Sequence, residues 1–282
     1  MIKLFMCLSG SGMDRKIDFY PYLLVPAQYF LSKRTGRLTK TVYIPPCEEL
    51  FLDSSGFSLM TKFNDYPFSL EQYVLLVKKL KPTYFATMDY PCELALIEKT
   101  SLSVRERIRR TIENTETLMN NYSYPSKLIP VVQGWTLEDY KFCILEMHRR
   151  DLLTDYIAFG TMCCRKSLLE VKKLIIKLTD FLWQFVDAKV HCFGLSIRFL
   201  RDFAIRQRIH SIDTSAWTFN SGNSKRFASN GDELWRNWNQ FLNKVRILLS
   251  KNCGQITLFQ LSSSSLHSSG KEVREEKGGR WC

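Results

Sequence analysis

The sequence lacks three features that would place it in a membrane, secreted or disulfide-rich class. No apolar run reaches the roughly 20 residues of a membrane-spanning helix, since charged residues interrupt even the stretch 168–186. The first nine residues hold one lysine and no small-residue cleavage site, which argues against a secretory signal. The nine cysteines are odd in number and scattered, with only Cys163 and Cys164 adjacent, so we expect reduced thiols that pack in a core. These absences predict a soluble cytoplasmic protein.

Acidic residues are also scarce relative to basic ones. The chain has 28 Asp and Glu against 40 Lys and Arg, a formal charge of +12 at pH 7. This excess favours a polyanionic partner, because each phosphate that is neutralised releases condensed counterions. Charge alone does not separate a nucleic-acid-binding protein from a merely basic one. Hydrophobic residues make up 45% of the 282, which supplies a core and excludes a disordered or fibrous chain.

Short apolar runs alternate with helical patterns along most of the chain, and each run ends in small or polar residues. Eight such runs are candidate strands. They cover residues 2–8, 22–25, 50–53, 83–89, 128–133, 156–160, 190–195 and 209–213.

The segments between these runs predict helices. Ser69 with Gln72, and Ser103 with Glu106, have the spacing of helix N-terminal caps, and Thr136 begins a third helix. Further helices are expected over 167–187, 197–208 and 232–249, and one more strand over 255–261.

Strands separated by helices pair in parallel through crossover connections. Eight units in 282 residues fit an α/β fold, a single (β/α)8 TIM-like barrel over residues 1–261, better than the alternative of an open doubly wound sheet. The amino-terminal units are irregular, because the first two runs are too close for a full helix and 32–46 is a long basic excursion. Residues 262–282 have little to bury and predict a disordered tail.

In such a barrel the functional site forms at the carboxyl ends of the strands. Asp53, Asp89, Gln133 and Asp213 each lie at one of these ends, so they are expected to face one mouth. A single Asp after a strand is more often the cap of the next helix than a catalyst. Carboxylates brought together shift one another's pKa values at a cost in stability, which favours a functional reading of the set.

The order of motifs D-S-x-G-F, M-D-Y-P, V-Q-G, G-x-x-C-x-R, H-x-F-G-L and S-I-D-x-S-A-W, from about residue 50 to 217, resembles the queuine and archaeosine tRNA-guanine transglycosylase superfamily. It is most similar to the bacterial and viral branch that inserts 7-deazaguanines into DNA. The resemblance implies a pentosyltransferase that exchanges guanine for a base such as preQ0, in the cytoplasm of the cell or of a virus's host. The target base has to leave its duplex, so accessory DNA-modification proteins are candidate partners.

The resemblance implies roles for particular residues. Asp213 would attack C1′ of the nucleotide and hold a covalent sugar intermediate, and Asp53 would act as general acid and then base. Six other residues are implied as base-binding or base-stacking groups. They are Ser54, Asp89, Gln133, Gly160, Thr161, and either Tyr90 or Trp135 as the stacking aromatic, although both aromatics are at least as well explained as rim or core residues.

For several other basic, histidine and cysteine residues, a structural role competes with a functional one. Arg165, Lys225 and Arg226 are candidates to grip the phosphates beside a flipped nucleotide, against the alternative of solvated surface charge. His191 is better explained as a satisfied core histidine than as a catalyst. The pair Cys163 and Cys164 is better explained by packing than as a thiol nucleophile.

The sequence departs from the pattern of the tRNA enzymes in three places. Ser55 stands where the family has Gly. After the nucleophile, the C-x-C-x-x-C and His motif of their structural zinc site is missing, since only Cys253, His267 and Cys282 follow, so we expect no metal and no other cofactor. The C-V-x-P-T-R continuation is also missing, which favours the DNA branch. A tRNA-modifying enzyme and a catalytically silent nucleic-acid-binding barrel remain the alternatives.

Overall fold

The computed structural model describes residues 2–32, 34–165, 167–220, 223–228 and 230–250. Its main sheet has nine parallel strands in the order β5-β4-β3-β2-β1-β9-β8-β7-β6. Every strand pairs in parallel with its neighbours, as expected for strands joined by crossover helices. The strands are β1 (Lys3–Cys7), β2 (Tyr22–Pro26), β3 (Glu49–Asp53), β4 (Tyr84–Ala86), β5 (Lys127–Ile129), β6 (Val131–Val132), β7 (Tyr156–Phe159), β8 (Lys189–Cys192) and β9 (Ser211–Thr214).

The sheet curls into a barrel whose two ends meet at Pro130. β5 pairs with β4 on one side of this proline, and β6 pairs with β7 on the other. Pro130 has no N–H to donate, yet its carbonyl accepts the Ala158 N–H at 2.9 Å. β5 and β6 are therefore one barrel strand interrupted at a proline, which confirms the TIM-like barrel and the eight expected strands.

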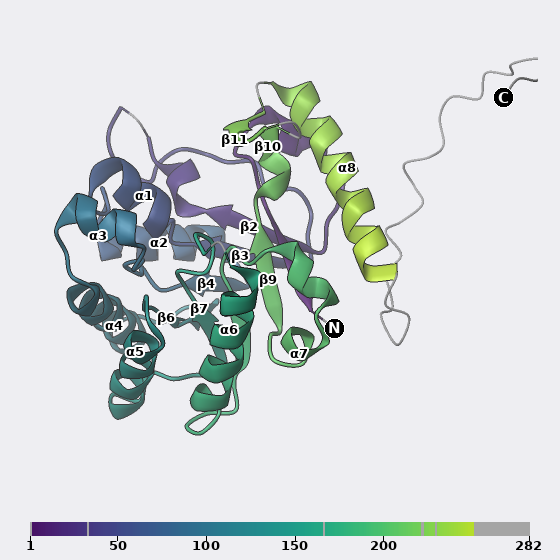
Figure 1. The fold of residues 1–282 in the computed structure, drawn as a ribbon. Helices are drawn as coiled ribbons and strands as arrows, with labels where there is room; N and C mark the ends of the chain where they lie inside the picture. The colour runs from purple at the N-terminus through teal and green to yellow at the C-terminus, as the bar shows by residue number, and fades with distance from the viewer. Residues whose placement is uncertain (1, 33, 166, 221–222, 229, 251–282) are drawn as a thin grey trace, which may run out of the picture.

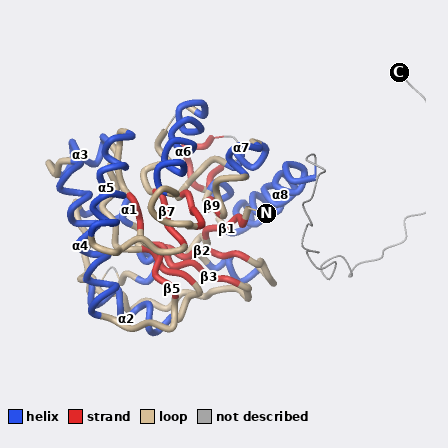
Figure 2. The backbone as a smooth tube through the Cα atoms, turned by 90° about the horizontal axis from the view of Figure 1, so that it is seen from below, coloured by secondary structure: helices blue, strands red, loops and turns tan. Residues whose placement is uncertain are grey.

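Helices surround the strands, as Figure 2 shows from below. In Figure 1, α1 to α5 lie on one flank of the barrel and α8 on the opposite flank, with α6 and α7 between them. The helices are α1 (Gly56–Phe63), α2 (Leu70–Leu80), α3 (Leu94–Thr100), α4 (Val104–Asn121), α5 (Leu137–Arg149), α6 (Leu168–Leu182), α7 (Phe203–Arg206) and α8 (Gly231–Ser250), with 3-10 turns η1 (Gly12–Lys16), η2 (Ala27–Phe30), η3 (Ile197–Arg201) and η4 (Ala216–Thr218). A short antiparallel hairpin, β10 (Phe219–Asn220) and β11 (Asn223–Phe227), precedes α8.

Most helix starts carry the caps that the sequence indicates. The hydroxyls of Ser69, Ser103 and Thr136 each accept the backbone N–H three residues on, and full capping boxes form at the first and the last of them. The helix expected over 197–208 is wrong as one element, because Asp202 adopts an extended conformation and caps α7 after η3 has ended. Helices α1 and α3 are additions that the sequence patterns did not indicate.

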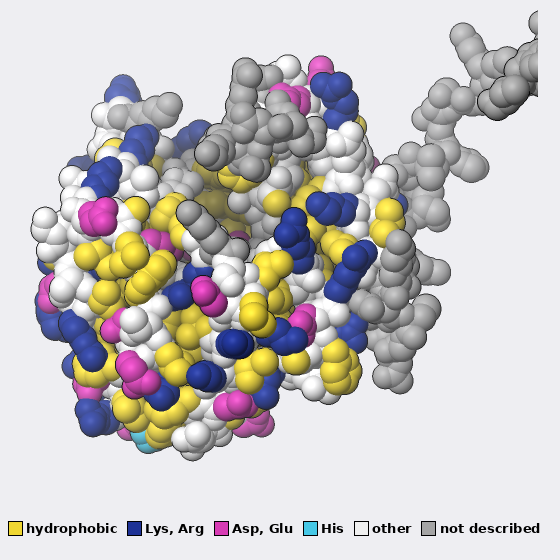
Figure 3. All heavy atoms as spheres, viewed as in Figure 1, with side chains coloured by type: hydrophobic (Ala, Val, Ile, Leu, Met, Phe, Trp, Pro, Cys, Tyr) yellow, Lys and Arg dark blue, Asp and Glu magenta, His cyan; other side chains and the backbone are white. Residues whose placement is uncertain are grey.

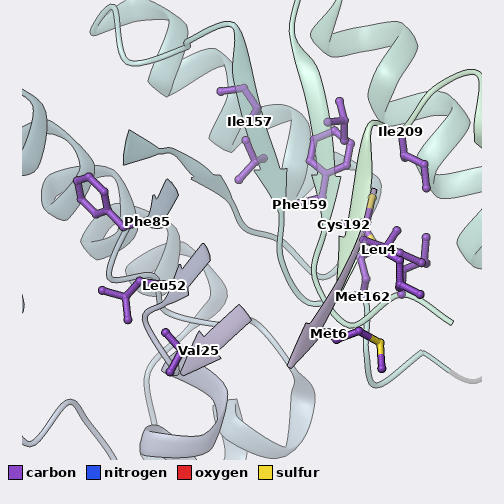
Figure 4. Close-up of a cluster of buried hydrophobic side chains, with 14 of the residues drawn as sticks. Leu4, Met6, Val25, Leu52, Phe85, Ile157, Phe159, Met162, Cys192 and Ile209 are labelled. Atoms are coloured by element: carbon purple, nitrogen blue, oxygen red, sulfur yellow. The ribbon is translucent and has the colours of Figure 1, made fainter. Parts of the chain in front are cut away.

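Strand alternation sends side chains into two separate cores. The outer core lies between strands and helices, and Figure 4 shows some of its members, among them Met6, Leu52 and Phe159. The inner core fills the barrel and uses the alternate positions, such as Phe5, Phe51 and Ala158. Residues on the inner phase of a strand therefore face the barrel interior.

Two further expectations concern membrane-spanning helices and the carboxyl-terminal segment. Among the described residues, no helix combines the length and the apolar composition needed to cross a membrane. The expected strand 255–261 and tail 262–282 lie outside the described residues, so the domain boundary at 261 stays a prediction.

Candidate active site

Strand parity brings two aspartates to the carboxyl-end mouth of the barrel. On β3, Phe51 belongs to the inner core, so Asp53 two residues later lies on the same inward phase. On β9, the inward positions are Ser211 and Asp213. Both aspartates are partly buried, and the Asp213 side chain is 14% exposed. The mouth therefore holds two carboxyls, one from β3 and one from β9, with β2 and β1 between these strands in the sheet.

A third carboxylate, Asp89, lies in the loop after β4 and is held by two side chains. The Ser54 hydroxyl donates to its Oδ1 at 2.7 Å, and the Gln133 amide donates to its Oδ2. Gln133 is oriented in turn by the Thr161 hydroxyl, which donates to its Oε1 at 2.6 Å. The Tyr66 hydroxyl donates to the Asp89 carbonyl at 2.8 Å. This network presents a carboxylate and an amide side by side, the pair needed to read the polar edge of a purine.

Two backbone positions explain how these side chains fit. A Cβ at Gly160 would lie 2.1 Å from Gln133 Nε2, so only glycine lets the Gln133 amide lie against this strand end. Ser55, which replaces the expected glycine, adopts a left-handed conformation with φ 67°. Its hydroxyl accepts the Gln28 N–H at 3.1 Å, which ties the loop after β3 to the turn after β2.

The carboxyls of the mouth differ from ordinary exposed acids. Burial, followed by repulsion from Asp89 and Asp213, raises the pKa of Asp53 to about 8, against a smaller opposing effect of the backbone N–H groups of Ser54 and Ser55. Burial also raises the pKa of Asp89, although the hydrogen bonds from Ser54 and Gln133 lower it in part. Asp53 is therefore protonated at neutral pH while it lies beside other carboxyl groups.

Asp213 is held by the neighbouring strand end. The Gly194 N–H donates to Asp213 Oδ1 at 2.7 Å, and His191 Nε2 lies 3.4 Å from the same oxygen. His191 is fully buried on the inward phase of β8, which confirms that it lines the barrel. Its Nε2 nevertheless has no hydrogen-bond partner in the described part of the chain, so the expectation of a fully satisfied histidine is wrong.

Tyr90 and Trp135, the two candidates for stacking on the base, both contact other side chains of the protein. Tyr90 is 9% exposed, packs with Met60 and Leu96, and donates its hydroxyl to Asp65 at 2.9 Å. Trp135 is partly exposed, and the Arg165 guanidinium lies 4.7 Å from its ring centre.

Of the three basic residues expected to bind phosphates, the structure describes the side chain of one, Arg165. Arg165 donates to the Thr161 carbonyl at 3.0 Å and to the Trp135 carbonyl at 2.6 Å, so it braces the loop that carries Thr161. The side chains of Lys225 and Arg226, on β11, lie outside the described residues. On the face that Figure 3 shows, Lys and Arg side chains are interspersed with acidic and hydrophobic ones.

Glu93 is a residue of the mouth that the sequence patterns missed. It is 3% exposed, and its carboxylate lies 3.4 Å from the Thr161 hydroxyl and 3.7 Å from the Cys163 thiol. Burial raises its pKa to about 7. Its position four residues after Asp89, in the same strand-end loop, is the signal that could have revealed it.

Among the described residues, one group has the ligand types and spacing of a metal site. Its members are Glu93, Cys163 and Cys164, whose ligand atoms lie within 4.8 Å of one another. Both cysteines are exposed, so the expectation that they pack in a core is wrong. A Cβ at Gly194 would lie 2.5 Å from the Cys163 Cβ, so glycine at this position lets the loop of the cysteines approach the end of β8. The expectation that the chain binds no metal stays a prediction.

A comparison with known families adds an independent observation. The family model described as DeoxyPurine in DNA protein A matches residues 23–255. The matched segment runs from β2 past α8 and includes the three aspartates and the glutamine of the mouth. No curated protein matches the sequence.

Proposed function

Because the chain belongs to the DeoxyPurine in DNA protein A family, the DNA-modifying branch that the motifs resemble, we propose that it exchanges guanine in DNA for a 7-deazaguanine such as preQ0. The observation that best supports this chemistry is the pair Asp53 and Asp213 in one barrel mouth, with the pKa of Asp53 raised to about 8 by burial and by the neighbouring carboxyls. A protonated acid beside a second carboxyl is the arrangement that double displacement at a sugar carbon requires.

In the first half of the proposed reaction, guanine leaves. A carboxylate oxygen of Asp213 forms a bond to C1′ of the deoxyribose while the bond from C1′ to the base nitrogen breaks. The electron pair of the broken bond goes to the base, which takes up the proton that Asp53 carries. The product of this half-reaction is an ester between Asp213 and the sugar, with Asp53 ionised.

In the second half, the 7-deazaguanine enters and reverses these steps. Asp53 removes the proton from the ring nitrogen of the incoming base, and that nitrogen attacks C1′. The ester bond breaks, and its electron pair returns to Asp213. Both carboxyls then have their starting protonation states, so the exchange consumes no other reactant.

The network around Asp89 suits the recognition of a guanine-like base. The Asp89 carboxylate retains lone pairs beyond those used by Ser54 and Gln133, so it can accept from the ring N–H and the exocyclic amine. The second amide hydrogen of Gln133 can donate to the carbonyl oxygen of the base. The close approach of the backbone at Gly160 and Thr161 supports the placement of this oxygen against the β7 end.

The target nucleotide has to leave a duplex to reach such a mouth. The chain's charge of +12 supports electrostatic binding of the flanking phosphates, with Arg165, Lys225 and Arg226 as proposed contacts. A separate protein that opens the duplex is a further proposed partner.

The test is nucleoside mass spectrometry of DNA and tRNA from cells that express the chain and contain preQ0. We expect deazaguanosine in the DNA digest, and its loss in the Asp213→Ala variant, because no covalent intermediate can form. Asp187→Ala is the matched control, since Asp187 is exposed and precedes β8 at the opposite, amino-end face of the barrel. Modification only in tRNA would transfer the proposal to tRNA. Its absence from both pools, and also from single-stranded DNA treated with the purified chain, which needs no duplex-opening partner, would contradict it.

A further inference from the structure

A chain of hydrogen bonds inside the barrel leads to the carboxylate of Asp213. The register of β8 and β9 pairs His191 with Ser211, so their inward side chains are neighbours. The Tyr156 hydroxyl and the Ser211 hydroxyl are 2.6 Å apart, and the Ser211 hydroxyl is 2.6 Å from His191 Nδ1. The other ring nitrogen of His191, Nε2, lies 3.4 Å from Asp213 Oδ1.

The facing carboxylate determines where the imidazole proton lies. A lone pair on Nε2 would be repelled by Asp213 Oδ1, so the proton belongs on Nε2. In a neutral ring Nδ1 then accepts, and it accepts from Ser211, which in turn accepts from Tyr156. Every donor in the chain therefore points toward Asp213.

The described rings packed around His191 are aromatic hydrocarbons, which offer no oxygen or nitrogen acceptor for this proton. Its ring is enclosed by the rings of Phe193, Phe51 and Phe5, with centroids 4.5, 5.0 and 6.1 Å away. Within the described residues, Nε2 is a buried nitrogen without a hydrogen bond. A buried donor left unpaired is destabilising, and such groups are rare unless they serve a function.

We propose that His191 is a positioning residue, which donates from Nε2 to Asp213 Oδ1 when DNA is bound and leaves the second carboxylate oxygen to attack C1′. This inference rests on the proposed role of Asp213. The Gly194 N–H already donates to Oδ1 at 2.7 Å, and no hydrogen bond to Oδ2 occurs among the described residues. Two donors on one oxygen fix the plane of the carboxylate, and the 3.4 Å separation needs only a small closure, as catalytic contacts often do on substrate binding.

The test compares two amide replacements that differ in reach. The Gln amide nitrogen of His191→Gln can occupy the place of Nε2 and donate to Asp213. The shorter amide of His191→Asn occupies the place of Nδ1, where it can pair with Ser211 but cannot reach Asp213. We expect His191→Asn to lower kcat by about 10- to 100-fold, the loss expected for one hydrogen bond to a charged group, with little change in KM for the base. We expect His191→Gln to restore most of kcat.

The opposite ranking, or equal losses in both variants, would overturn the positioning role, because a purely structural histidine is replaced best by the variant that satisfies Ser211. Melting temperatures of both variants control for folding.

Nitrogen NMR of the histidines in wild type and Asp213→Asn provides a readout that does not depend on activity. An Nε2–H tautomer whose shift responds to Asp213→Asn supports the contact, and an Nδ1–H tautomer refutes it. If the wild type exchanges no base, the proposed function fails while the NMR result still decides whether His191 donates to Asp213.

Discussion

A carboxyl group whose pKa is raised by the fold makes the folded state less stable as the pH rises above the ordinary pKa of that group. Asp53 is such a group, since burial and the nearby Asp89 and Asp213 raise its pKa to about 8. In the unfolded chain its pKa is near the ordinary value of about 3.9. The folded state therefore binds more protons than the unfolded state between these two values, and its stability falls as the pH rises through this window.

This linkage predicts the behaviour of Asp53→Asn. The variant lacks the ionisable group, so its free energy of unfolding relative to wild type should rise by about 4 kcal/mol between pH 5 and pH 8.5, at about 1.4 kcal/mol for each pH unit below the raised pKa. It should also lose base exchange, because an amide cannot supply the proton. Urea unfolding at both pH values measures the effect. A difference between variant and wild type that does not change with pH would show that the pKa of Asp53 is not raised in the folded state.

At the scale of single elements, α2, α4 and α5 begin with side-chain caps at the residues that the sequence indicated. The Ser69 hydroxyl accepts the Gln72 N–H, and the Gln72 side chain accepts the Ser69 N–H, which satisfies two donors at the start of α2. Helix α1 begins instead at Ser55, in a left-handed conformation and without a side-chain cap, and it was not predicted. A local signal therefore decides which helices can be found from sequence.

The cap of α2 gives a prediction at this scale. Ser69→Ala should lower the free energy of unfolding by about 1 kcal/mol, because one hydrogen-bond donor of the first turn loses its partner. Ser69→Asp retains an acceptor at the same place and should stay close to wild type. Chemical denaturation of the three proteins measures the difference, and base exchange should be unchanged because α2 contributes no residue to the mouth. Equal stability of the alanine variant and wild type would mean that the capping box contributes nothing.

At the scale of the whole molecule, closure of the barrel at Pro130 is what gathers the site. It places the ends of β3, β6 and β9 around one mouth, although Asp53, Gln133 and Asp213 are far apart in the sequence. The same fold carries the Glu93, Cys163 and Cys164 group on its rim. Residues that are distant in the sequence can therefore form a metal-ligand set that no motif spacing would indicate.

We expect the purified chain to contain zinc well below one ion per chain, and EDTA to leave both base exchange and the melting temperature unchanged. The reason is that the thiol spacing of a four-ligand structural zinc site is absent from the sequence. Elemental analysis before and after chelation measures this. One zinc per chain, with stability lost on chelation, would contradict the prediction, and Cys163→Ser with Cys164→Ser would then show whether the rim group holds it.

The sequence by itself determined the eight barrel strands, most of the helices, the α/β barrel class and the family, because alternation, caps and strand-end motifs are local patterns that survive without tertiary contacts. Only the tertiary structure decided the partners of each functional group. Ser54 meets Asp89, and His191 meets Asp213, through strand parity and register, which depend on how the barrel closes. The raised pKa of Asp53 and the unpaired Nε2 of His191 also arise from burial among groups distant in sequence, so no local pattern could indicate them.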